Sequence, residues 1–278
     1  MTAYCPIPTA VIQDDFVQIE HVGKLYASDN GAVEVLRDIR FHVAGRQFVS
    51  ILGASGCGKS TLLMMLAGLE PISSGRIIVG GQPVLAPRRD VGVIFQDPTL
   101  LSWKSALENV LLPIEIFREP VARYRDRAET LLRMVGLGAA MHRRPGQLSG
   151  GMRQRVAICR ALIHDPLVLL MDEPFSSLDA ITRDDLNTAL LEIWQRQKQT
   201  AFFVTHSIRE AVFLSDRVIV LGGRPGKVIA DVKVSFARPR DPLIGDTAEF
   251  NGICAALRAH LATGRGADDD SDTTRTVR

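Results

Sequence analysis

The sequence has no long apolar segment and no large excess of charge of either sign. Its 278 residues hold 33 Lys and Arg against 31 Asp and Glu, a formal net charge of +2. This balance argues against the broad basic surface of nucleic-acid-binding proteins, so we expect no nucleic acid as a partner. The most apolar runs, TLLMMLAGL and PLVLLM, are about half or less of the roughly 20 residues that a membrane-spanning helix needs. Any association with a membrane is therefore expected to be peripheral.

Cysteine is also scarce. The four cysteines form no Cys-x-x-Cys pair and lie beside no histidine cluster, so neither a zinc site nor a disulfide framework is indicated, and a reducing cytoplasm fits best. The N-terminal stretch MTAYCPIPTAVIQDDF lacks a basic leader and a long apolar segment, and predicts no signal peptide. No internal repeat is visible. With 46% hydrophobic and 23% charged residues, the chain is expected to form a packed globular protein.

Apolar residues alternate between strand and helix patterns along the chain. Residues 16–52 combine short apolar runs with turn residues, which predicts strands joined by hairpins. Residues 99–161 follow mostly helical patterns and predict a helical lobe. The runs PLVLLMDEP and TAFFVTHS predict buried strands that alternate with helices, which indicates a parallel α/β sheet. DRVIVLGGRPGKVIADVKV predicts two closing strands around a Gly-Pro turn, and the polar end GRGADDDSDTTRTVR predicts disorder.

The stretch LGASGCGKSTLLMMLAGL interrupts an apolar pattern with bare backbone. Gly53, Gly58, Lys59 and Ser60 match G-x-x-x-x-G-K-[ST], the phosphate loop. A plain helix-entry turn would not require Lys and Ser together. Glycines let successive N–H groups turn inward around phosphate oxygens at a helix N-terminus, Lys59 would reach the β- and γ-phosphates, and the Ser60 hydroxyl would hold Mg²⁺. The loop therefore predicts nucleotide binding.

Two further stretches could contribute to the same site. Asp172 and Glu173 end the run LVLLMDEP, at the edge where parallel sheets bind ligands; Asp172 could steady the metal and Glu173 could polarise an attacking water. The alternative for two acids here is a helix N-cap. QLSGGMRQRVAICRAL contains a Ser-Gly-Gly turn before a basic helix start, which is either a second anion cradle or a plain helix start.

In chain order, the phosphate loop, VIFQD, LSGGM, LLMDEP, SSLDA and VTHS resemble the ATP-binding subunit of an ABC transporter over about residues 16–240. The resemblance implies a P-loop NTPase parallel-sheet core with an antiparallel β subdomain and a helical subdomain. It also implies a head-to-tail homodimer that sandwiches two ATP molecules and hydrolyses them. The expected organisation is an N-terminal extension at 1–14, the ATP-binding domain at 15–244 with its helical subdomain at about 97–166, and a C-terminal helix and disordered tail at 245–278.

The resemblance assigns site residues one by one. Those expected to act in hydrolysis are Glu173, His206 and Gln96, and those expected to hold Mg²⁺ are Ser60, Gln96 and Asp172. Those expected to bind ATP are Tyr26, Gly53, Ser55, Gly56, Cys57, Gly58, Lys59, Ser60, Thr61, Ser149, Gly150, Gly151 and Asp179. From the residues alone, Tyr26 could instead be an ordinary strand aromatic and His206 a structural histidine. Met152 and Ser177 depart from the commonest signature and D-loop residues without removing a charge.

Longer phrases point to a branch of the family. FQDPTLLSWKSALENVLLPIE, THSIREAVFLSDRVIVL, RPGKV and ARPRDP resemble the nitrate/sulfonate/taurine importers. That branch implies separate permease subunits, an extracytoplasmic substrate-binding protein, a small anion as cargo, and a place on the cytoplasmic face of the inner or plasma membrane. Leu100, Leu101 and Trp103 are candidates for the permease contact, with core packing as the alternative.

Other functions stay open at this stage: the ATPase of another ABC importer branch, a non-transport ABC ATPase, or a free-standing P-loop kinase or regulatory module. The signature argues against the last. Repair ATPases insert a long coiled coil between phosphate loop and signature, whereas Lys59 and Ser149 are close in this sequence, and translation ATPases carry two cassettes. Fewer than about 40 residues follow Arg240, too few for an appended regulatory domain of usual size.

Overall fold

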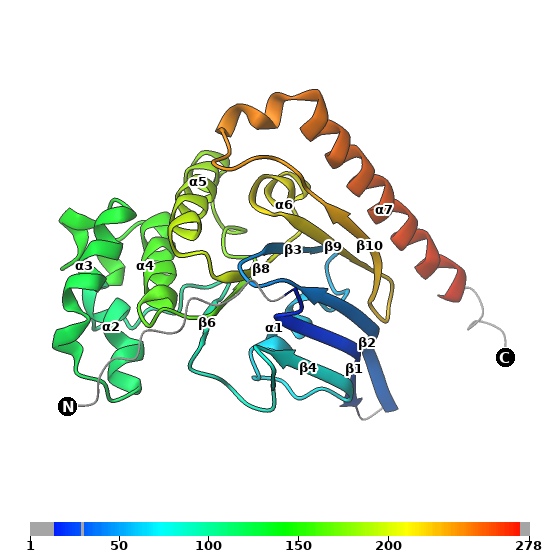
Figure 1. Cartoon of the computed structure of the whole chain (residues 1–278), viewed down its shortest axis with the longest axis horizontal. Helices are drawn as coiled ribbons and strands as arrows, with labels where there is room; N and C mark the ends of the chain where they lie inside the picture. The colour runs from blue at the N-terminus through cyan, green and yellow to red at the C-terminus, as the bar shows by residue number, and fades with distance from the viewer. Residues whose placement is uncertain (1–13, 29–30, 273–278) are drawn as a thin grey trace.

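The computed structural model describes residues 14–28 and 31–272, and only the backbone for 264–272. Its core is a six-stranded sheet in the order β10-β9-β3-β8-β7-β6 (Figure 1). Neighbouring strands are parallel except for the antiparallel pair β9 and β10. The strands are β3 (Phe48–Gly53), β6 (Val91–Ile94), β7 (Val168–Asp172), β8 (Thr200–Thr205), β9 (Arg217–Gly222) and β10 (Lys227–Lys233). The predicted α/β architecture is confirmed.

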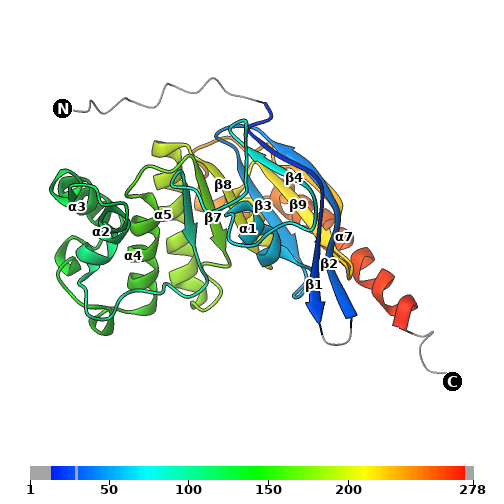
Figure 2. The same cartoon turned by 90° about the horizontal axis from the view of Figure 1, so that it is seen from below.

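A second, antiparallel sheet has the order β2-β1-β4-β5. Its strands are β1 (Val17–Ser28), β2 (Gly31–Val43), β4 (Ser74–Val79) and β5 (Gln82–Pro83). The strands predicted within residues 16–52 are thus present as β1, β2 and β3. Figure 2 shows β1 and β2 at the end of the molecule opposite to a lobe made of α2, α3 and α4.

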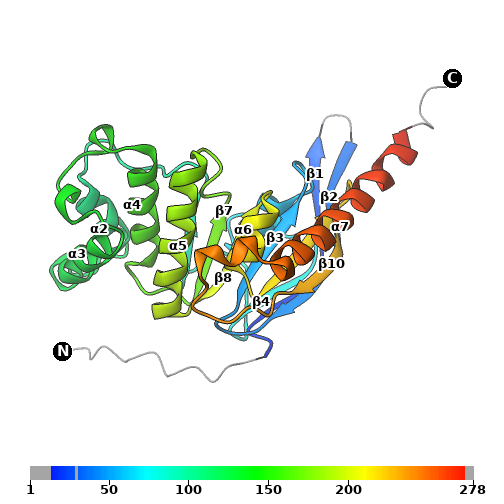
Figure 3. The same ribbon diagram turned by 90° about the horizontal axis from the view of Figure 1, so that it is seen from above.

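Helices cover both faces of the core sheet and form the separate lobe. They are α1 (Lys59–Leu66), α2 (Ala106–Ile116), α3 (Arg125–Met134), α4 (Gly150–Leu162), α5 (Ala180–Gln197), α6 (Ile208–Leu214) and α7 (Ala248–Asp272), with short 3₁₀ turns η1 (Val121–Arg123), η2 (Gly138–Ala140), η3 (Pro145–Gln147) and η4 (Pro242–Asp246). Figure 3 shows α6 and α7 over one face of the sheet. No helix within the described residues has the length and apolar character needed to cross a membrane.

The central strand β3 is buried along its whole length, because apolar layers cover both of its faces. Phe48 packs with Trp194 and Phe203 on the side of α5, with ring centroids 5.4 and 6.2 Å away. Val49 and Ile51 point to the other side, into the cluster that includes α1 and the antiparallel sheet. This two-sided packing fixes the position of the loop that follows β3.

The structure describes only part of each end of the chain. Most of the predicted N-terminal extension lies outside the described residues. At the other end, α7 continues to Asp272 and so includes part of the polar stretch from Gly264 for which the composition predicts disorder; residues 273–278 lie outside the described part.

Candidate functional site

Four segments meet at the carboxyl edge of the core sheet. The phosphate loop follows β3, His206 follows β8, Asp172 ends β7, and Gln96 lies two residues after β6. Because these four strands are parallel neighbours, their ends lie side by side at one edge, where α/β sheets bind ligands. Ser60 and Asp172, which are 112 positions apart in the chain, are brought into contact in this way.

The phosphate loop has the backbone that its glycines permit. Gly56 and Gly58 have φ of +82° and +90°, in the region that L side chains rarely adopt, and Gly58 is the N-cap of α1. The Lys59 ammonium, which is 5% exposed, donates to the carbonyl oxygens of Gly53 and Ala54 at 3.1 and 2.9 Å. The loop is therefore curled around its own lysine, next to the N-terminus of a helix.

The other loop positions predicted to bind nucleotide have distinct surroundings. Ser55 is exposed, whereas Cys57 is buried at 3% exposure. Burial raises the pKa of the Cys57 thiol, so it remains protonated and unreactive near neutral pH. Thr61 lies in the first turn of α1. The described cysteines, Cys57, Cys159 and Cys254, are all free thiols, as expected from their spacing.

Ser60 and Asp172 form the oxygen-rich part of the site. The Ser60 hydroxyl donates to Asp172 Oδ1 at 2.9 Å. Burial raises the pKa of Asp172 above its ordinary value, because desolvation penalises the charged carboxylate. A hydroxyl, a carboxylate and the nearby Gln96 amide are hard oxygen donors of the type that Mg²⁺ prefers, so these residues fit the implied metal.

Glu173 lies at the centre of a charged cluster. Its Oε2 is 3.0 Å from Nδ1 of His206, and its Oε1 is 3.9 Å from Nζ of Lys59. Its backbone has φ of +43°, a conformation that costs energy in a non-glycine residue and is typical of functional sites. The amide of Glu173 donates to the Val204 carbonyl at 3.0 Å, which secures this strained turn to β8. The side chain of Glu173 thus lies within reach of both His206 and the loop lysine.

A hollow of about 650 Å³ opens beside these residues. Gln96, Asp172 and Gly150 all line it, so the hollow joins the core sheet to the start of α4 in the helical lobe. Ser149 is the N-cap of α4, and its hydroxyl accepts from the Met152 amide at 3.3 Å. A Cβ on Gly151 would lie 2.6 Å from Thr182 Cγ2, so only glycine permits this approach of α4 to α5. The Ser-Gly-Gly turn is thus both a helix start and one wall of the hollow.

The structure places two predicted residues apart from this cluster. Tyr26 lies in β1 of the antiparallel sheet, 37% exposed, with the Lys24 ammonium 4.5 Å from its ring centroid. Asp179 is the N-cap of α5 and accepts from the Thr182 amide at 3.0 Å. This hydrogen bond holds the pKa of Asp179 below its ordinary value.

One polar group beneath the site is missing from the sequence-based prediction. Glu210 is 8% exposed, accepts from the Thr205 hydroxyl at 2.6 Å, and lies 3.6 Å from Nε of Arg183. Ser207, the N-cap of α6, accepts from the Glu210 amide at 3.4 Å. Together these contacts fix the backbone on both sides of His206. The sequence signal was available: Ser207 and Glu210 have the S-x-x-E spacing of a capping box.

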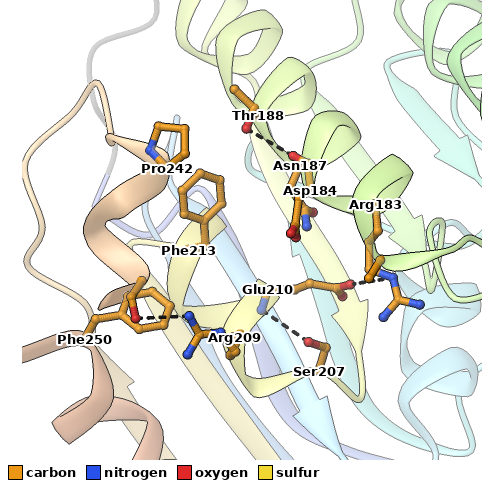
Figure 4. Close-up of a pocket in the computed structure, with 12 residues that line it drawn as sticks. Arg183, Asp184, Asn187, Thr188, Ser207, Arg209, Glu210, Phe213, Pro242 and Phe250 are labelled. Atoms are coloured by element: carbon orange, nitrogen blue, oxygen red, sulfur yellow. Dashed lines mark hydrogen bonds and ion pairs between the residues drawn. The ribbon is translucent and has the colours of Figure 1, made fainter. Parts of the chain in front are cut away.

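Figure 4 shows Glu210, Ser207 and Arg183 on the wall of a second hollow, between α5, α6 and the C-terminal segment. Its volume is about 330 Å³, and Phe213, Pro242 and Phe250 form its apolar side. Because α5 begins after Asp179 and α6 begins after His206, this hollow lies behind two segments of the site rather than within it.

The comparison with known protein families decides the identity. The family described as ABC transporter matches residues 36–176, from β2 through the phosphate loop to the acids that end β7. The chain belongs to the ABC transporter family. As an ABC ATPase it is an ATP hydrolase, and the sequence-based identification of the family is confirmed.

Relatives extend the match over most of this ABC ATPase. The nitrate import ATP-binding protein NrtD of Synechococcus elongatus is 41% identical over 87% of this chain and 89% of its own length. The taurine import ATP-binding protein TauB of Burkholderia thailandensis is 44% identical over 78% of this chain and 84% of its own length. Among solved structures, the ATP-binding cassette MJ0796, a dimer in a post-hydrolysis state with ADP and Pi, has a TM-score of 0.70 and 31% identity over 80% of this chain and all of that one.

Proposed function

We propose that the chain is the ATPase of an importer for a small anion such as nitrate, taurine or an alkanesulfonate. The observation that carries the hydrolytic part is the position of the Glu173 carboxylate between His206 and Lys59 at the mouth of the phosphate loop. The names of relatives that import nitrate and taurine support the cargo class. They favour this branch over other importers and over non-transport ABC ATPases.

Nucleotide binding follows from the loop. The phosphates are surrounded by backbone amides of residues 53–61, which include Gly53, Ser55, Gly56, Cys57, Gly58, Ser60 and Thr61. When ATP binds, the Lys59 ammonium exchanges its two carbonyl partners for phosphate oxygens. Ser60, Asp172 and Gln96 hold Mg²⁺, which when bound neutralises charge on the phosphates. Burial raises the pKa of Asp172, and a cation beside its carboxylate would offset this cost of desolvation.

Hydrolysis requires a base beside the γ-phosphate. Glu173 accepts the proton of the attacking water, because its carboxylate is held next to the loop without bonding to the metal donors. His206, whose side chain is 58% exposed, reaches both Glu173 and the space where the γ-phosphate would lie. Gln96, which lines the hollow together with Asp172, orients the water.

Closure of the site requires a second copy of the chain. Ser149, Gly150 and Gly151 present the N-terminus of α4 to the γ-phosphate bound by the partner copy, and the helix dipole favours this anion. Asp179, held at the start of α5, couples the two sites, and Tyr26 stacks on adenine. The dimeric solved cassette supports this arrangement.

The permease and the substrate-binding protein are separate chains. Trp103 is 66% exposed and follows Gln96 by seven residues, so it can pass movement at the hydrolytic site to a membrane partner. A chain that serves such a permease lies peripherally at the cytoplasmic face of the inner or plasma membrane.

Co-purification and transport test this function. Affinity-tagged chain should bring down a polytopic membrane protein from its own organism, and proteoliposomes containing both should take up labelled nitrate or taurine when ATP and the binding protein are supplied. The isolated Trp103→Glu chain should retain its ATPase activity but should no longer co-purify with the membrane protein. Leu243→Glu, a change at an equally exposed apolar residue on the C-terminal segment, is the matched control. Recovery of ribosomes or DNA instead of a membrane protein would overturn the proposal.

A further inference from the structure

The turn between β9 and β10, residues 223–226, joins the two sheets of the molecule. Leu36 of β2 pairs with Gly226 of this turn in an isolated parallel bridge. The Gly226 amide donates to the Val35 carbonyl, and the Arg37 amide donates to the Gly226 carbonyl, both at 2.9 Å. The antiparallel sheet, in which Tyr26 pairs with β2, is therefore hydrogen-bonded to a turn of the core sheet.

The same turn lies against the phosphate loop. A Cβ on Gly226 would lie 2.1 Å from the carbonyl oxygen of Cys57, so only glycine permits this contact. The Arg224 guanidinium donates to the Ser55 carbonyl at 3.5 Å and lies 3.3 Å from the position of a Cβ on Gly56. These contacts involve carbonyl groups of the loop, whereas the proposed function assigns its amides to phosphate.

The strand β2 touches the loop at the next residue. A Cβ on Gly58 would lie 2.5 Å from Leu36 Cδ2, and Leu36 is fully buried. Leu36 and Gly226, which pair with each other, thus pack on two consecutive loop residues. The loop itself is anchored in the core, since Gly53 ends β3 and Lys59 begins α1.

We propose that the 223–226 turn sets the distance between the phosphate loop and the sheet that carries Tyr26, so that one ATP can reach both. Arg224 and Gly226 are positioning residues in this role, which rests on the proposed nucleotide binding by the loop and by Tyr26. The adenine base and the triphosphate belong to one molecule. The affinity gained when Tyr26 binds the base while the loop binds the phosphates therefore depends on how closely the spacing of Tyr26 and the loop matches the length of the nucleotide. The RPG sequence at 224–226 supplies both the cation and the glycine that this contact needs.

Gly226→Ala tests the spacing directly. The added methyl collides with Cys57, and because the loop is anchored at both ends, the turn and β2 move instead. The dissociation constant of ATP should rise by about tenfold or more, while that of inorganic tripolyphosphate, which has no base, should change by less than about threefold. Gly146→Ala is the matched control, because a Cβ there meets nothing within 4 Å.

A double-mutant cycle separates positioning from general support of the loop. In a Tyr26→Ala chain, Gly226→Ala should weaken ATP binding by less than about threefold, since the base contact is already lost. Arg224→Ala introduces no collision and carries the test if Gly226→Ala does not fold. It should weaken ATP more than tripolyphosphate, whereas Lys227→Ala, which removes the same charge from β10, should leave both unchanged.

Two results would overturn the turn's role: equal weakening of ATP and tripolyphosphate by Gly226→Ala or Arg224→Ala, or a full effect of Gly226→Ala in the Tyr26→Ala chain. Neither result contradicts the proposed function, because the unsubstituted chain still binds ATP in each case. Failure of the unsubstituted chain to bind ATP would overturn both proposals. Isothermal titration calorimetry gives the constants, and thermal unfolding checks that each variant is folded.

Discussion

Oε2 of the Glu173 carboxylate lies 3.0 Å from Nδ1 of the His206 imidazole. The two residues follow neighbouring parallel strands, β7 and β8, and are 33 positions apart in the chain. On the other side of the carboxylate, Lys59 Nζ is 3.9 Å away. This position between an imidazole and the loop lysine supports the proposed role of Glu173 as the base.

Glu173→Gln should abolish most hydrolysis without abolishing ATP binding. The amide keeps the size and a hydrogen bond to His206 but cannot accept a proton, so kcat should fall by about a hundredfold or more. The trapped ATP should then stabilise a dimer that elutes earlier in size-exclusion chromatography. Glu192→Gln, an exposed change on α5, is the control. Turnover within about threefold of the parent would refute the assignment of Glu173 as the base.

Lys59→Ala should weaken nucleotide binding directly. The ammonium now bonded to Gly53 and Ala54 would be lost, and hydrogen bonds to charged groups contribute about 1.5–3 kcal/mol. The dissociation constant of ATP, measured by calorimetry, should rise by roughly ten- to a hundredfold. Lys233→Ala on β10 should leave it unchanged. An unaltered constant for Lys59→Ala would show that the loop does not hold the phosphates.

Residues adjacent in the sequence lend themselves to prediction, because their chemistry is local. The spacing of Gly53, Gly58, Lys59 and Ser60 alone indicates a phosphate cradle, and the structure has the helix and positive φ values that such a cradle needs. The contact of Ser60 with Asp172 could also be anticipated, since parallel strands end at one edge.

Contacts set by packing between distant segments could not be predicted. Nothing local requires Glu173 to adopt a positive φ, which depends on its bond to Val204 in the next strand. The pairing of Leu36 with Gly226 depends on how two sheets dock, and the RPG sequence gives no sign of its partner. The helical reach of α7 to Asp272 likewise goes beyond what the polar composition indicates.

Asp172→Asn should change the requirement for magnesium. Asn can still accept from Ser60, but it lacks the negative charge that burial makes costly and a cation would offset. The Mg²⁺ concentration for half-maximal hydrolysis should rise by about tenfold or more, as for other losses at metal sites. Binding of ATP in EDTA should be unaffected, and Asp185→Asn serves as control. An unchanged Mg²⁺ requirement would exclude Asp172 from the metal site.

Glu210 should make stability fall as pH rises. Burial raises its pKa above the ordinary 4.5, so the folded chain holds the proton more tightly than the unfolded chain. The contribution of Glu210 to the free energy of unfolding is fully present below the pKa of Glu210 in the unfolded chain. It is lost as pH rises through the pKa of Glu210 in the folded chain. Relative to Glu210→Gln, which does not titrate, the parent's free energy of unfolding should therefore decrease as pH rises above the ordinary pKa of 4.5. Urea unfolding at several pH values measures this difference.

Glu108 provides an internal control of opposite sign. The Ser105 hydroxyl and amide donate to its carboxylate at 2.6 and 2.7 Å and lower its pKa, so its contribution is present above the unfolded pKa and is lost as pH falls. Relative to Glu108→Gln, the parent's free energy of unfolding should increase as pH rises toward the ordinary pKa of 4.5 and should stay level above it, so urea unfolding is also measured below pH 4.5. Because both variants exchange Glu for Gln on a helix, a general effect of net charge would move them in the same direction. Opposite slopes would therefore assign the pH dependence to burial at Glu210 and to capping at Glu108, whereas parallel slopes would contradict the Glu210 prediction.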